Sequence, residues 1–402
     1  MGMRRNIRSH RGGEGLTLPR IVLVTELYPP AVGGSAILFA NVYSRLPGRD
    51  VTVLTAPMHG RGGAGSIRIE DCPIESRRRG IASIADIRHH VRIAWQIRAA
   101  SRGARTLVHC ARGLPEGIAA CLAHFAGGPR YICWAHGEEI AAALTSREHR
   151  FVLKQVVRRA AAFVANSRST AKMIEGLGVP TARIRVAYPG VDAARFHPGV
   201  PAEALRRRFA ASAELLLLSV GRLQRRKGQD LVIQALGRLR DEAPRLRYVV
   251  VGDGDERRRL ETLAREHGVS DRVTFAGEVS AAELPTFFAA CDIFLLPNRL
   301  DGQDIEGFGI VFLEAAAAGK PAIGGRTGGV PEAIAEGETG ALVEGTSAEE
   351  LAAAIRLLAR SPEVRARMGE AGRRRVLERF TWERAAATVA DLDSSLRNGD
   401  AH

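Results

Sequence analysis

Two carboxylates, Glu306 and Glu314, flank the sequence Gly-Phe-Gly with seven residues between them, at the start of an apolar run. Gly307 and Gly309 let backbone approach a ligand, and the first N–H groups of the helix that follows are unpaired within it, so this segment suits anionic oxygen. Glu314 would lie about two helical turns beyond Glu306. The two carboxylates could bind both ends of an extended ligand with an anionic centre, and a sugar nucleotide has this layout. The alternative, a solvated pair on a surface helix, is disfavoured by the apolar, glycine-rich flanks.

Two cations, Arg222 and Lys227, follow the apolar run 215–220, which predicts a strand. Arginine offers a planar fork of donors and lysine a compact charge, the two ways in which proteins bind phosphate oxygens. Ligands of α/β sheets bind beyond the carboxyl ends of strands, so this position favours a diphosphate site over a surface ion pair, the alternative interpretation. The neighbouring Arg225 and Arg226 are expected to face solvent.

Two motifs in the first half of the chain occupy similar positions. Gly33 and Gly34 follow the first predicted strand and precede a helix, where glycines let main chain approach a sugar or phosphate, although such pairs are often only turns. His136 ends a later strand, within Trp-Ala-His-Gly-Glu. A single histidine is more often a packed or surface residue than a catalyst, so its residue type alone leaves its role open.

Asp253 and Asp255 form an Asp-x-Asp sequence after another strand, and such a pair can chelate Mn²⁺ or Mg²⁺ together with a nucleotide diphosphate. The charge that a metal would bring is already supplied by Arg222 and Lys227. The sequence therefore predicts no metal and no other cofactor.

These motifs lie along two runs of alternating strands and helices. In the first half, strands are expected at 21–25, 51–54, 107–110, 131–134 and 162–165, with helices at about 36–46, 84–101, 116–125 and 141–159. In the second half, strands are expected at 215–220, 248–251, 273–275, 293–296 and 322–323, with helices near 230–240, 256–266, 281–289, 310–318 and 348–358. Residues 188–198 are turn-rich and predict a linker. Two Rossmann-like domains facing a central cleft are therefore expected.

Length and composition agree with this organisation. A chain of 402 residues, 46% of them hydrophobic and 25% charged, suits two globular domains. The five cysteines include no CxxC pair, which predicts reduced thiols and a cytoplasmic location. No apolar run reaches the roughly 20 residues of a membrane span. The arginine-rich opening lacks the apolar region of a secretion signal, so residues 1–19 are expected to form a disordered basic tail.

The positive charge is concentrated in the first half of the chain. Residues 1–190 carry a formal charge of +16 and residues 191–402 carry −2, which together give the +14 of the whole chain. One interpretation of this excess is that the arginines lie on solvent-exposed faces and bind no partner. The other is a basic N-terminal half that meets an anionic membrane surface or a phosphorylated acceptor, through residues 77–79 and through Lys154, Arg158 and Arg159.

The glutamate pair, the arginine–lysine pair and the glycine loop occur together and in the order found in one family. They resemble the motifs of the retaining GT-B glycosyltransferases of family 4, also called glycosyl transferases group 1, and the resemblance runs from about residue 21 to the C-terminal helices. It implies an α/β, GT-B fold with an acceptor-binding N-terminal domain at 20–190 and a nucleotide-sugar-binding C-terminal domain at 191–379. The C-terminal helices, above all residues 380–402, would pack back onto the N-terminal domain.

The resemblance also implies roles for individual residues. His136 would contact the donor sugar and, with its main chain, support the leaving group. Arg222 and Lys227 would neutralise the diphosphate, and Glu306 would hold hydroxyls of the sugar. The remaining residues expected to bind the donor are Gly33, Gly34, Gly252, Val279, Phe308, Gly309, Ile310 and Glu314, which would take the ribose.

Weaker matches concern the acceptor side and the loops. Glu138 and Glu139 lie where family members contact the acceptor. Gly328 and Gly329 would let backbone approach the sugar, and Glu332 would cap the helix that starts there.

The activity that the resemblance implies is transfer of a hexose with retention of anomeric configuration, by a front-face displacement in which the departing phosphate deprotonates the acceptor hydroxyl. The loop 298–305 is similar to that of the phosphatidylinositol mannosyltransferases of actinobacteria, which use GDP-mannose, so mannose is favoured. The acceptor would be a hydroxyl of a lipid-linked, polyol or saccharide molecule. A sugar-nucleotide epimerase or hydrolase would share the cleft. A nucleic-acid-binding protein is the remaining alternative, and an aromatic content of 5% disfavours it.

Overall fold

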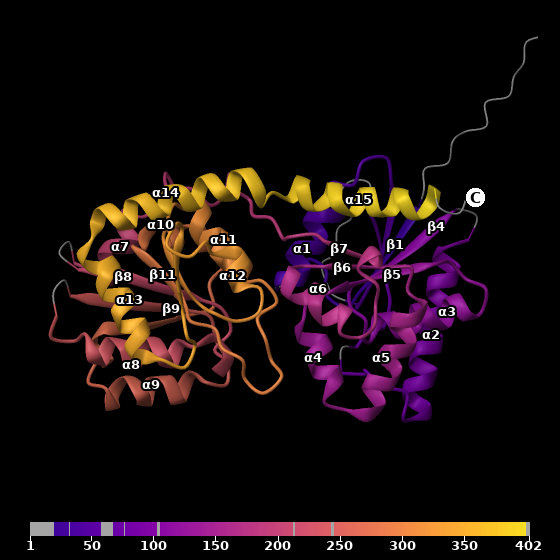
Figure 1. Cartoon of the computed structure of the whole chain (residues 1–402), viewed down its shortest axis with the longest axis horizontal. Coiled ribbons are helices and arrows are strands. Elements are labelled where there is room, and N and C mark those ends of the chain that lie inside the picture. The colour runs from indigo at the N-terminus through magenta and orange to yellow at the C-terminus, as the bar shows by residue number, and fades with distance from the viewer. Residues whose placement is uncertain are drawn as a thin grey trace, which may run out of the picture.

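The computed structural model describes residues 20–31, 33–57, 67–75, 77–102, 105–211, 214–242 and 245–398, so the expected tail at 1–19 lies outside the described residues. Two α/β domains stand side by side, and a long helical segment at the C-terminal end runs across both (Figure 1). The predicted fold class, two parallel-sheet Rossmann-like domains, is confirmed.

The N-terminal domain is built on a seven-stranded parallel sheet in the order β3-β2-β1-β4-β5-β6-β7. Its strands are β1 (Arg20–Thr25), β2 (Asp50–Thr55), β3 (Ile67–Asp71), β4 (Thr106–Cys110), β5 (Tyr131–Ala135), β6 (Ala162–Ala165) and β7 (Ile184–Val186). Its helices are α1 (Gly34–Tyr43), α2 (Ile84–Ala100), α3 (Glu116–Phe125), α4 (Glu138–Leu144), α5 (Arg147–Arg159) and α6 (Arg168–Glu175), followed by the short 3₁₀ helix η1 (Thr181–Arg183). The central strands are continuous apolar runs because helices cover both faces of the sheet.

The C-terminal domain repeats this plan on a six-stranded parallel sheet in the order β10-β9-β8-β11-β12-β13. Its strands are β8 (Leu215–Val220), β9 (Leu246–Val251), β10 (Val273–Gly277), β11 (Ile293–Leu296), β12 (Ala322–Gly325) and β13 (Gly340–Val343). Its helices are α7 (Glu203–Phe209), α8 (Gln229–Arg238), α9 (Arg257–Glu266), α10 (Leu284–Ala290), α11 (Ile310–Ala317), α12 (Val330–Ala333), α13 (Ala348–Arg360) and α14 (Pro362–Arg379), with the 3₁₀ helices η2 (Arg225–Lys227) and η3 (Ser270–Arg272). The last helix of the chain, α15 (Trp382–Asn398), belongs to the other domain.

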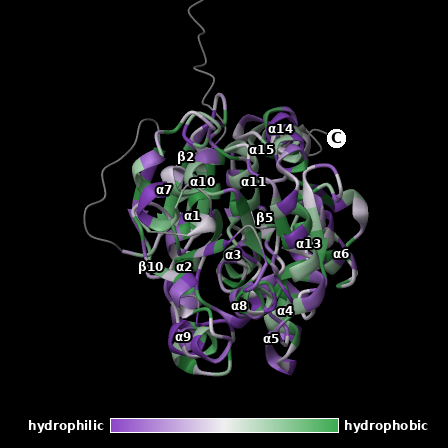
Figure 2. Cartoon of the chain, turned by 90° about the vertical axis from the view of Figure 1, so that its left-hand side faces the viewer, coloured by the Kyte–Doolittle hydropathy of each residue, from purple (hydrophilic) through white to green (hydrophobic). Residues whose placement is uncertain are grey.

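Four apolar clusters fill the spaces between sheets and helices. In the N-terminal domain, one cluster lies under α2, α3 and α5 and the other under α1 and α15. In the C-terminal domain, one lies under α10 and α11 and the other under α8, α9 and α13. Seen from the side of the C-terminal domain, the hydrophilic colour lies on outer helices such as α9 (Figure 2). Both sheets are thus rigid supports for the loops at their strand ends.

The chain crosses between the domains twice, and the two crossings touch. Residues after Tyr188 lead outward, and the N–H of Val191 donates to the carbonyl of Phe380, 3.1 Å away, on the returning segment. Gly190 lies so close to the returning backbone that a Cβ there would be 2.4 Å from the nitrogen of Trp382. The helices before and after the returning segment pack on different domains: α14 packs on α11 of the C-terminal domain, and α15 packs on α1 of the N-terminal domain. The expectation that the C-terminal helices pack back onto the N-terminal domain therefore holds for α15, whereas α14 packs on the C-terminal domain.

Several elements differ from the predicted ones, among them α6 and α7, which were not predicted. The helix expected over 141–159 is two helices, α4 and α5, because the side chain of Ser146 caps the second by accepting the N–H of His149 at 3.4 Å. The strands β3, β7 and β13 were not predicted. They are edge strands of three to five residues, too short or too polar to give a clear apolar run.

Candidate active site

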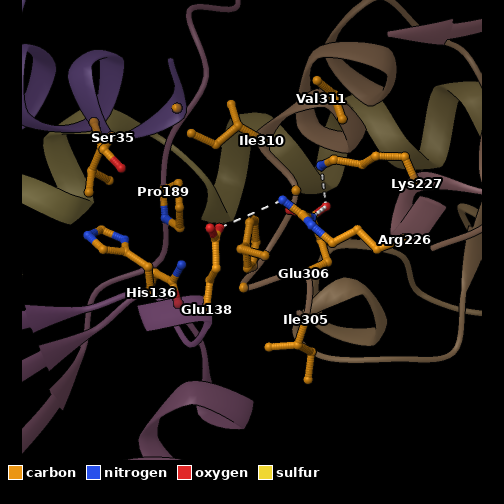
Figure 3. Close-up of a pocket in the computed structure, with 16 residues that line it drawn as sticks. Ser35, His136, Glu138, Pro189, Arg226, Lys227, Ile305, Glu306, Ile310 and Val311 are labelled. Atoms are coloured by element: carbon orange, nitrogen blue, oxygen red, sulfur yellow. Dashed lines mark hydrogen bonds and ion pairs between the residues drawn. The ribbon is translucent and has the colours of Figure 1, made fainter. Parts of the chain in front are cut away.

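A cavity of about 290 Å³ lies in the cleft between the domains, at the carboxyl ends of the strands (Figure 3). The N-terminal domain and the linker contribute Gly34, Ser35, Leu38, His136, Glu138, Asn166 and Pro189, and the C-terminal domain contributes Arg226, Lys227 and residues 305–311. The predicted site residues that line it are Gly34, His136, Lys227, Glu306, Phe308, Gly309 and Ile310. In each sheet the strand order reverses between two central strands, β1 and β4 in the N-terminal sheet and β8 and β11 in the C-terminal sheet. Open α/β sheets bind ligands at this topological switch point.

Glu306 is the centre of the charged side of the cavity. Its Oε2 accepts from Nζ of Lys227 at 2.5 Å, from Nη1 of Arg226 at 2.8 Å and from Nδ2 of Asn298 at 2.9 Å. Burial alone would raise the pKa of Glu306, but the charges of Lys227 and Arg226 outweigh it and hold the pKa below its ordinary value. Glu306 is therefore ionised, and the two cations paired with it, Lys227 and Arg226, line the cavity.

Arg226 faces the cavity, so the prediction that it faces solvent is wrong. In the 3₁₀ helix η2, three residues complete one turn, so successive side chains point in different directions. Arg225 points outward with a side chain that is 68% exposed, whereas the side chain of Arg226 is 11% exposed. Its guanidinium bonds to Asp304 and Glu306, both at 2.8 Å, and reaches Glu138 of the opposite domain at 3.7 Å (Figure 3). The acidic loop 301–306 could have indicated that Arg226 faces inward, because buried carboxylates need cationic partners.

Arg222 lies outside this cluster. It follows β8, is exposed, and does not line the cavity. Only its carbonyl oxygen has a described contact, accepting from Nε2 of Gln229 at 3.3 Å. Its contact with a diphosphate stays a prediction.

His136 forms the opposite wall of the cavity, and its hydrogen bonds fix its tautomer. Its Nε2 lies 3.0 Å from the carbonyl oxygen of Ala111, which can only accept, so Nε2 carries the hydrogen. Burial, helped by the charge of Arg112, lowers the pKa of His136 to about 4. The ring is therefore neutral at pH 7 and offers Nδ1 as a hydrogen-bond acceptor. Its main-chain N–H is already bonded to Oε1 of the buried Glu139, at 2.9 Å.

The two domains meet at the backbone of His136 and Gly307. A Cβ on Gly307 would lie 2.0 Å from the carbonyl oxygen of His136, so only glycine permits this approach. Asn166, 7% exposed, lies on the same side, with Nδ2 2.8 Å from that hypothetical Cβ. Glu138 also lines the cavity, with a side chain that is 61% exposed, and its contact with an acceptor stays a prediction.

The start of α11 faces the glycine loop across the cleft. Gly309 has a φ of 85°, a left-handed value that glycine adopts freely, and it turns the chain into α11. A Cβ on Gly34, the first residue of α1, would lie 3.9 Å from Cδ1 of Ile310. Two helix N-termini thus border the cavity, and each offers N–H groups to anionic oxygen.

Glu314 lies further along α11 and does not line the cavity. It is 6% exposed, and its Oε2 has no hydrogen-bond partner among the described residues. Burial raises the pKa of Glu314 to about 7, with the charge of Arg195 opposing that rise. An unpaired buried carboxyl group is costly, so it suits a hydrogen-bonding partner brought by a ligand, and its contact with ribose stays a prediction.

Besides Glu314, three predicted donor-binding residues do not line the cavity. Gly33 precedes α1 but does not line the cavity. Gly252 packs against the loop after β8, because a Cβ on it would lie 2.2 Å from the carbonyl oxygen of Gly221. Val279 lines a separate hollow of about 530 Å³ between α7, β10 and α10. The structure gives Gly252 a packing role, and contacts of all three with a donor stay predictions.

The glycine-rich segment after β12 supports the motif loop from behind. Cβ atoms on Gly328 and Gly329 would lie 2.0 and 2.1 Å from the carbonyl oxygens of Glu306 and Gly307. The backbone that these glycines approach is that of the motif itself, whereas the resemblance implied an approach to the sugar.

Glu332 caps a helix of the other domain. Its carboxylate accepts the N–H groups of Arg168 and Ser169, at 2.8 and 2.9 Å, at the start of α6. It also accepts the hydroxyl of Tyr188 at 2.8 Å. The prediction that it caps its own helix is wrong, since α12 has no side-chain cap and the orphan N–H groups that Glu332 meets lie across the domain boundary.

Asp253 and Asp255 do not form a metal-binding cluster in the part of the chain that the structure describes, where no three His, Cys, Asp or Glu side chains are placed to hold an ion. Oδ1 of Asp253 instead accepts the N–H of Gly254 at 2.8 Å. The metal independence of the reaction stays a prediction. No helix among the described residues is both long and apolar enough to cross a bilayer.

Solved structures with this architecture define the class of protein. The sucrose-phosphate synthase of Thermosynechococcus elongatus superposes with a TM-score of 0.80 at 22% identity, over 95% of this chain and 100% of that one. HepE of Anabaena, in complex with UDP, gives 0.76 at 19% identity, over 94% and 100% of the two chains. The fold is that of the GT-B glycosyltransferases.

Sequence comparison gives the family. Residues 202–375 match the model described as Glycosyl transferases group 1, and residues 32–195 match Glycosyltransferase Family 4. The GDP-mannose-dependent alpha-(1-6)-phosphatidylinositol monomannoside mannosyltransferase of Mycobacterium tuberculosis is 32% identical over 96% of this chain and 100% of its own. The protein of the same name from Mycolicibacterium smegmatis is 35% identical over 70% and 75% of the two chains. A D-inositol 3-phosphate glycosyltransferase of Stackebrandtia nassauensis is 37% identical over 58% and 54%. The chain belongs to glycosyltransferase family 4, and it is a glycosyltransferase.

Proposed function

We propose that the protein transfers mannose from GDP-mannose to a hydroxyl of a lipid-linked, polyol or saccharide acceptor, with retention of anomeric configuration and without a metal. The observation that carries the proposal is the convergence of Lys227 and Arg226 on Glu306, opposite the neutral His136, in one cleft. Relatives at 32 and 35% identity that are named GDP-mannose-dependent mannosyltransferases support the choice of donor.

In this proposal the C-terminal domain binds the diphosphate. The donor's phosphate oxygens would compete with Glu306 for Lys227 and Arg226, and N–H groups at the start of α11 would add further donors. Glu306, released from part of its ion pairing, would accept hydroxyls of the sugar. These groups are in place before the donor arrives, which is the arrangement that stabilises a developing charge most effectively.

The reaction would proceed on one face of the sugar. The acceptor oxygen forms a bond to the anomeric carbon as the bond from that carbon to the diphosphate oxygen breaks, and the acceptor proton passes to the departing phosphate. The carboxylates that line the cavity are already engaged, Glu306 with Lys227 and Glu138 with Arg226, so this route asks no side chain to act as base. Catalysis would rest on positioning and on the cations that neutralise the leaving group.

His136 would orient the sugar. Because Nε2 donates to Ala111, the open Nδ1 can accept a hydrogen bond from a hydroxyl of the hexose. A ring with a pKa of about 4 remains in this acceptor form across the physiological range.

We further propose that the N-terminal domain meets an anionic membrane surface from the cytoplasmic side. The helix α2 exposes Ile84, Ile87, Val91 and Trp95, at 70, 45, 39 and 64%, along one stripe with helical spacing. Phe125 of α3 and Phe151 of α5, at 72 and 58% exposed, lie on neighbouring helices. The exposed cations Lys154 and Arg158 accompany them on α5. Apolar and basic groups on one surface are typical of helices that lie in a lipid interface.

Thermal-shift measurements with GDP-, UDP-, ADP- and dTDP-sugars test the donor, because a bound donor stabilises the folded protein by mass action. GDP-mannose is expected to give the largest rise in melting temperature. Incubation with the donor alone, and then with candidate acceptors, separates a transferase from an epimerase or hydrolase. Rapid conversion of the donor without any acceptor would contradict the proposed transfer, and the anomeric configuration of the product, from NMR coupling constants, tests retention.

A further inference from the structure

A connected set of buried polar side chains lies beside His136 without lining the cavity. Trp134 of β5, Tyr43 of α1, His109 of β4 and Asp393 of α15 make up this buried relay, and each is at most 1% exposed. The four residues come from four elements, and the last of them is the helix that returns from the C-terminal domain.

The hydrogen bonds of the buried relay run in one direction. The indole Nε1 of Trp134 can only donate, and it lies 3.0 Å from the hydroxyl oxygen of Tyr43. The hydroxyl of Tyr43 therefore has its own hydrogen free for Nδ1 of His109, 2.7 Å away. His109 is then protonated on Nε2, which lies 4.0 Å from Oδ1 of Asp393, beyond hydrogen-bond distance, and has no hydrogen-bond partner among the described residues. Asp393 is held in turn by Arg49 and Arg397, each at 2.9 Å.

The relay ends against the ring of His136. The rings of Trp134 and His136 are nearly parallel, at 6°, with centroids 6.5 Å apart. Phe39 packs edge-on against both, 5.6 Å from Trp134 and 5.8 Å from His136. Rotation of the indole would therefore disturb the plane in which His136 lies, and with it the bond from Nε2 to Ala111.

Apolar side chains could fill this space without requiring partners. Buried polar groups add directional constraints that apolar packing lacks, because each lost bond leaves a group unsatisfied. The arrangement thus specifies one orientation of the indole beside the site, which a purely apolar core would leave free to vary.

We propose that Tyr43 and His109 are positioning residues for the transfer reaction. By holding the indole of Trp134 they fix the imidazole of His136 with Nε2 on the carbonyl of Ala111 and Nδ1 open to the donor sugar. This inference rests on the proposed function, in which His136 orients the hexose. Asp393 of α15 lies beside the far end of the relay, 4.0 Å from Nε2 of His109.

Tyr43→Phe tests the proposal, because it removes one oxygen and both bonds of the central member. Tyr131→Phe is the matched control: Tyr131 is equally buried on the same strand as Trp134, and its hydroxyl donates to the carbonyl of Val156 at 2.8 Å and is hydrogen-bonded to the thiol of Cys121, in the other core of the domain. Both variants should lose thermal stability. Only Tyr43→Phe should lower kcat and kcat/KM for the donor equally, by about tenfold, which marks the loss of an interaction in the transition state.

Two further readouts separate positioning from general damage. In ¹⁵N-histidine NMR, His136 of the wild type should be the Nε2–H tautomer, and Tyr43→Phe should give a mixture while Tyr131→Phe does not. In a His136→Ala background, Tyr43→Phe should cause no additional loss of kcat. If Tyr43→Phe fails to fold, His109→Gln, which removes the imidazole that Tyr43 bonds, takes its place.

The proposal is overturned if Tyr43→Phe keeps wild-type kcat and an unchanged tautomer, if Tyr131→Phe loses as much kcat, or if the loss persists without His136. A wild type that binds and turns over no sugar nucleotide would refute the proposed function instead, and the tautomer spectra would still decide whether the relay positions His136.

Discussion

The two walls of the cleft are built from different chemistry. The C-terminal wall is charged and already paired, with Lys227 and Arg226 bonded to Glu306. The N-terminal wall carries one carboxylate, Glu138, beside two neutral groups, a histidine whose pKa is about 4 and the hydroxyl of Ser35. A donor's diphosphate needs fixed cations, and the hydroxyls of a sugar need hydrogen-bond acceptors. In the proposed function the diphosphate would therefore lie against the charged wall, and the sugar would lie between Glu306 and the neutral His136.

The net charge of the two halves of the chain does not follow the charge of the two cavity walls. The half of the chain up to residue 190 carries +16, yet the cations of the cavity lie in the other half, which carries −2. The positive excess of the N-terminal half includes cations on α5, which packs on α3, the neighbour of α2 with its exposed apolar stripe. The net charge of each half therefore describes its outer surface, and it does not predict where the cations of the cavity lie.

Removing a cation from the C-terminal wall should lower kcat more than any other change proposed here. Lys227→Ala should lower kcat by roughly 10²–10³-fold, because it deletes a charge placed before the reaction at the leaving group. Arg225→Ala, in the same turn but with its side chain 68% exposed, should leave kcat unchanged. Full transferase activity in both Lys227→Ala and Glu306→Gln would contradict the assigned site.

Binding to vesicles should depend on the outer surface of the N-terminal domain. Trp95→Ser should weaken partitioning onto anionic vesicles by about tenfold, because an interfacial aromatic anchor is lost. Leu357→Ser, at a residue 59% exposed on α13 of the other domain, is the matched control and should change nothing. Co-sedimentation with vesicles of anionic or neutral lipid measures the effect, and equal binding of wild type and Trp95→Ser would contradict the membrane surface.

The buried carboxyl of Glu314 should make stability depend on pH. Its pKa rises from 4.5 to about 7 on folding, so the folded state holds a proton that the unfolded state has released between these values. Stability should therefore fall as pH rises from about 4.5 to about 7, by up to about 3 kcal/mol, and then level off. Denaturant titrations of the wild type and of Glu314→Gln across this range measure the difference, and identical pH profiles would show that the carboxyl is not buried unpaired.

The hydrogen bonds that Glu332 makes across the domain boundary should contribute the smallest of these effects, a modest part of the free energy of unfolding. Glu332→Gln weakens the cap on α6 and the bond from Tyr188, so the free energy of unfolding should fall by about 1 kcal/mol. Glu336→Gln, at an exposed ion pair with Arg326, should cost less in the same urea titration. A larger loss in the control than in Glu332→Gln would argue against an interdomain cap.

The sequence predicted the fold and the motif loop because their signals are local. Apolar runs mark the central strands, and the glycines around Phe308 mark the turn into α11, whose start at Ile310 agrees with the prediction. These features depend on neighbours in the chain and so can be recognised without tertiary structure.

The parts that were not predicted depend on contacts between distant segments. Arg226 was placed in solvent because the carboxylate of Glu306, 80 positions away, reaches it only in the folded chain. Glu332 meets α6 from 164 positions away, and the bond from Trp134 to Tyr43 spans 91 positions. No pattern within one element of sequence contains such pairs.

In the proposed function a nucleotide-diphosphate sugar lies in the cleft with its diphosphate against Lys227 and Arg226. A crystal structure of the protein with GDP-mannose would show where the donor binds. We expect density for the diphosphate between these cations and the start of α11, with the hexose beside Glu306 and Nδ1 of His136. Density for the nucleotide at any place remote from that cleft would contradict this expectation.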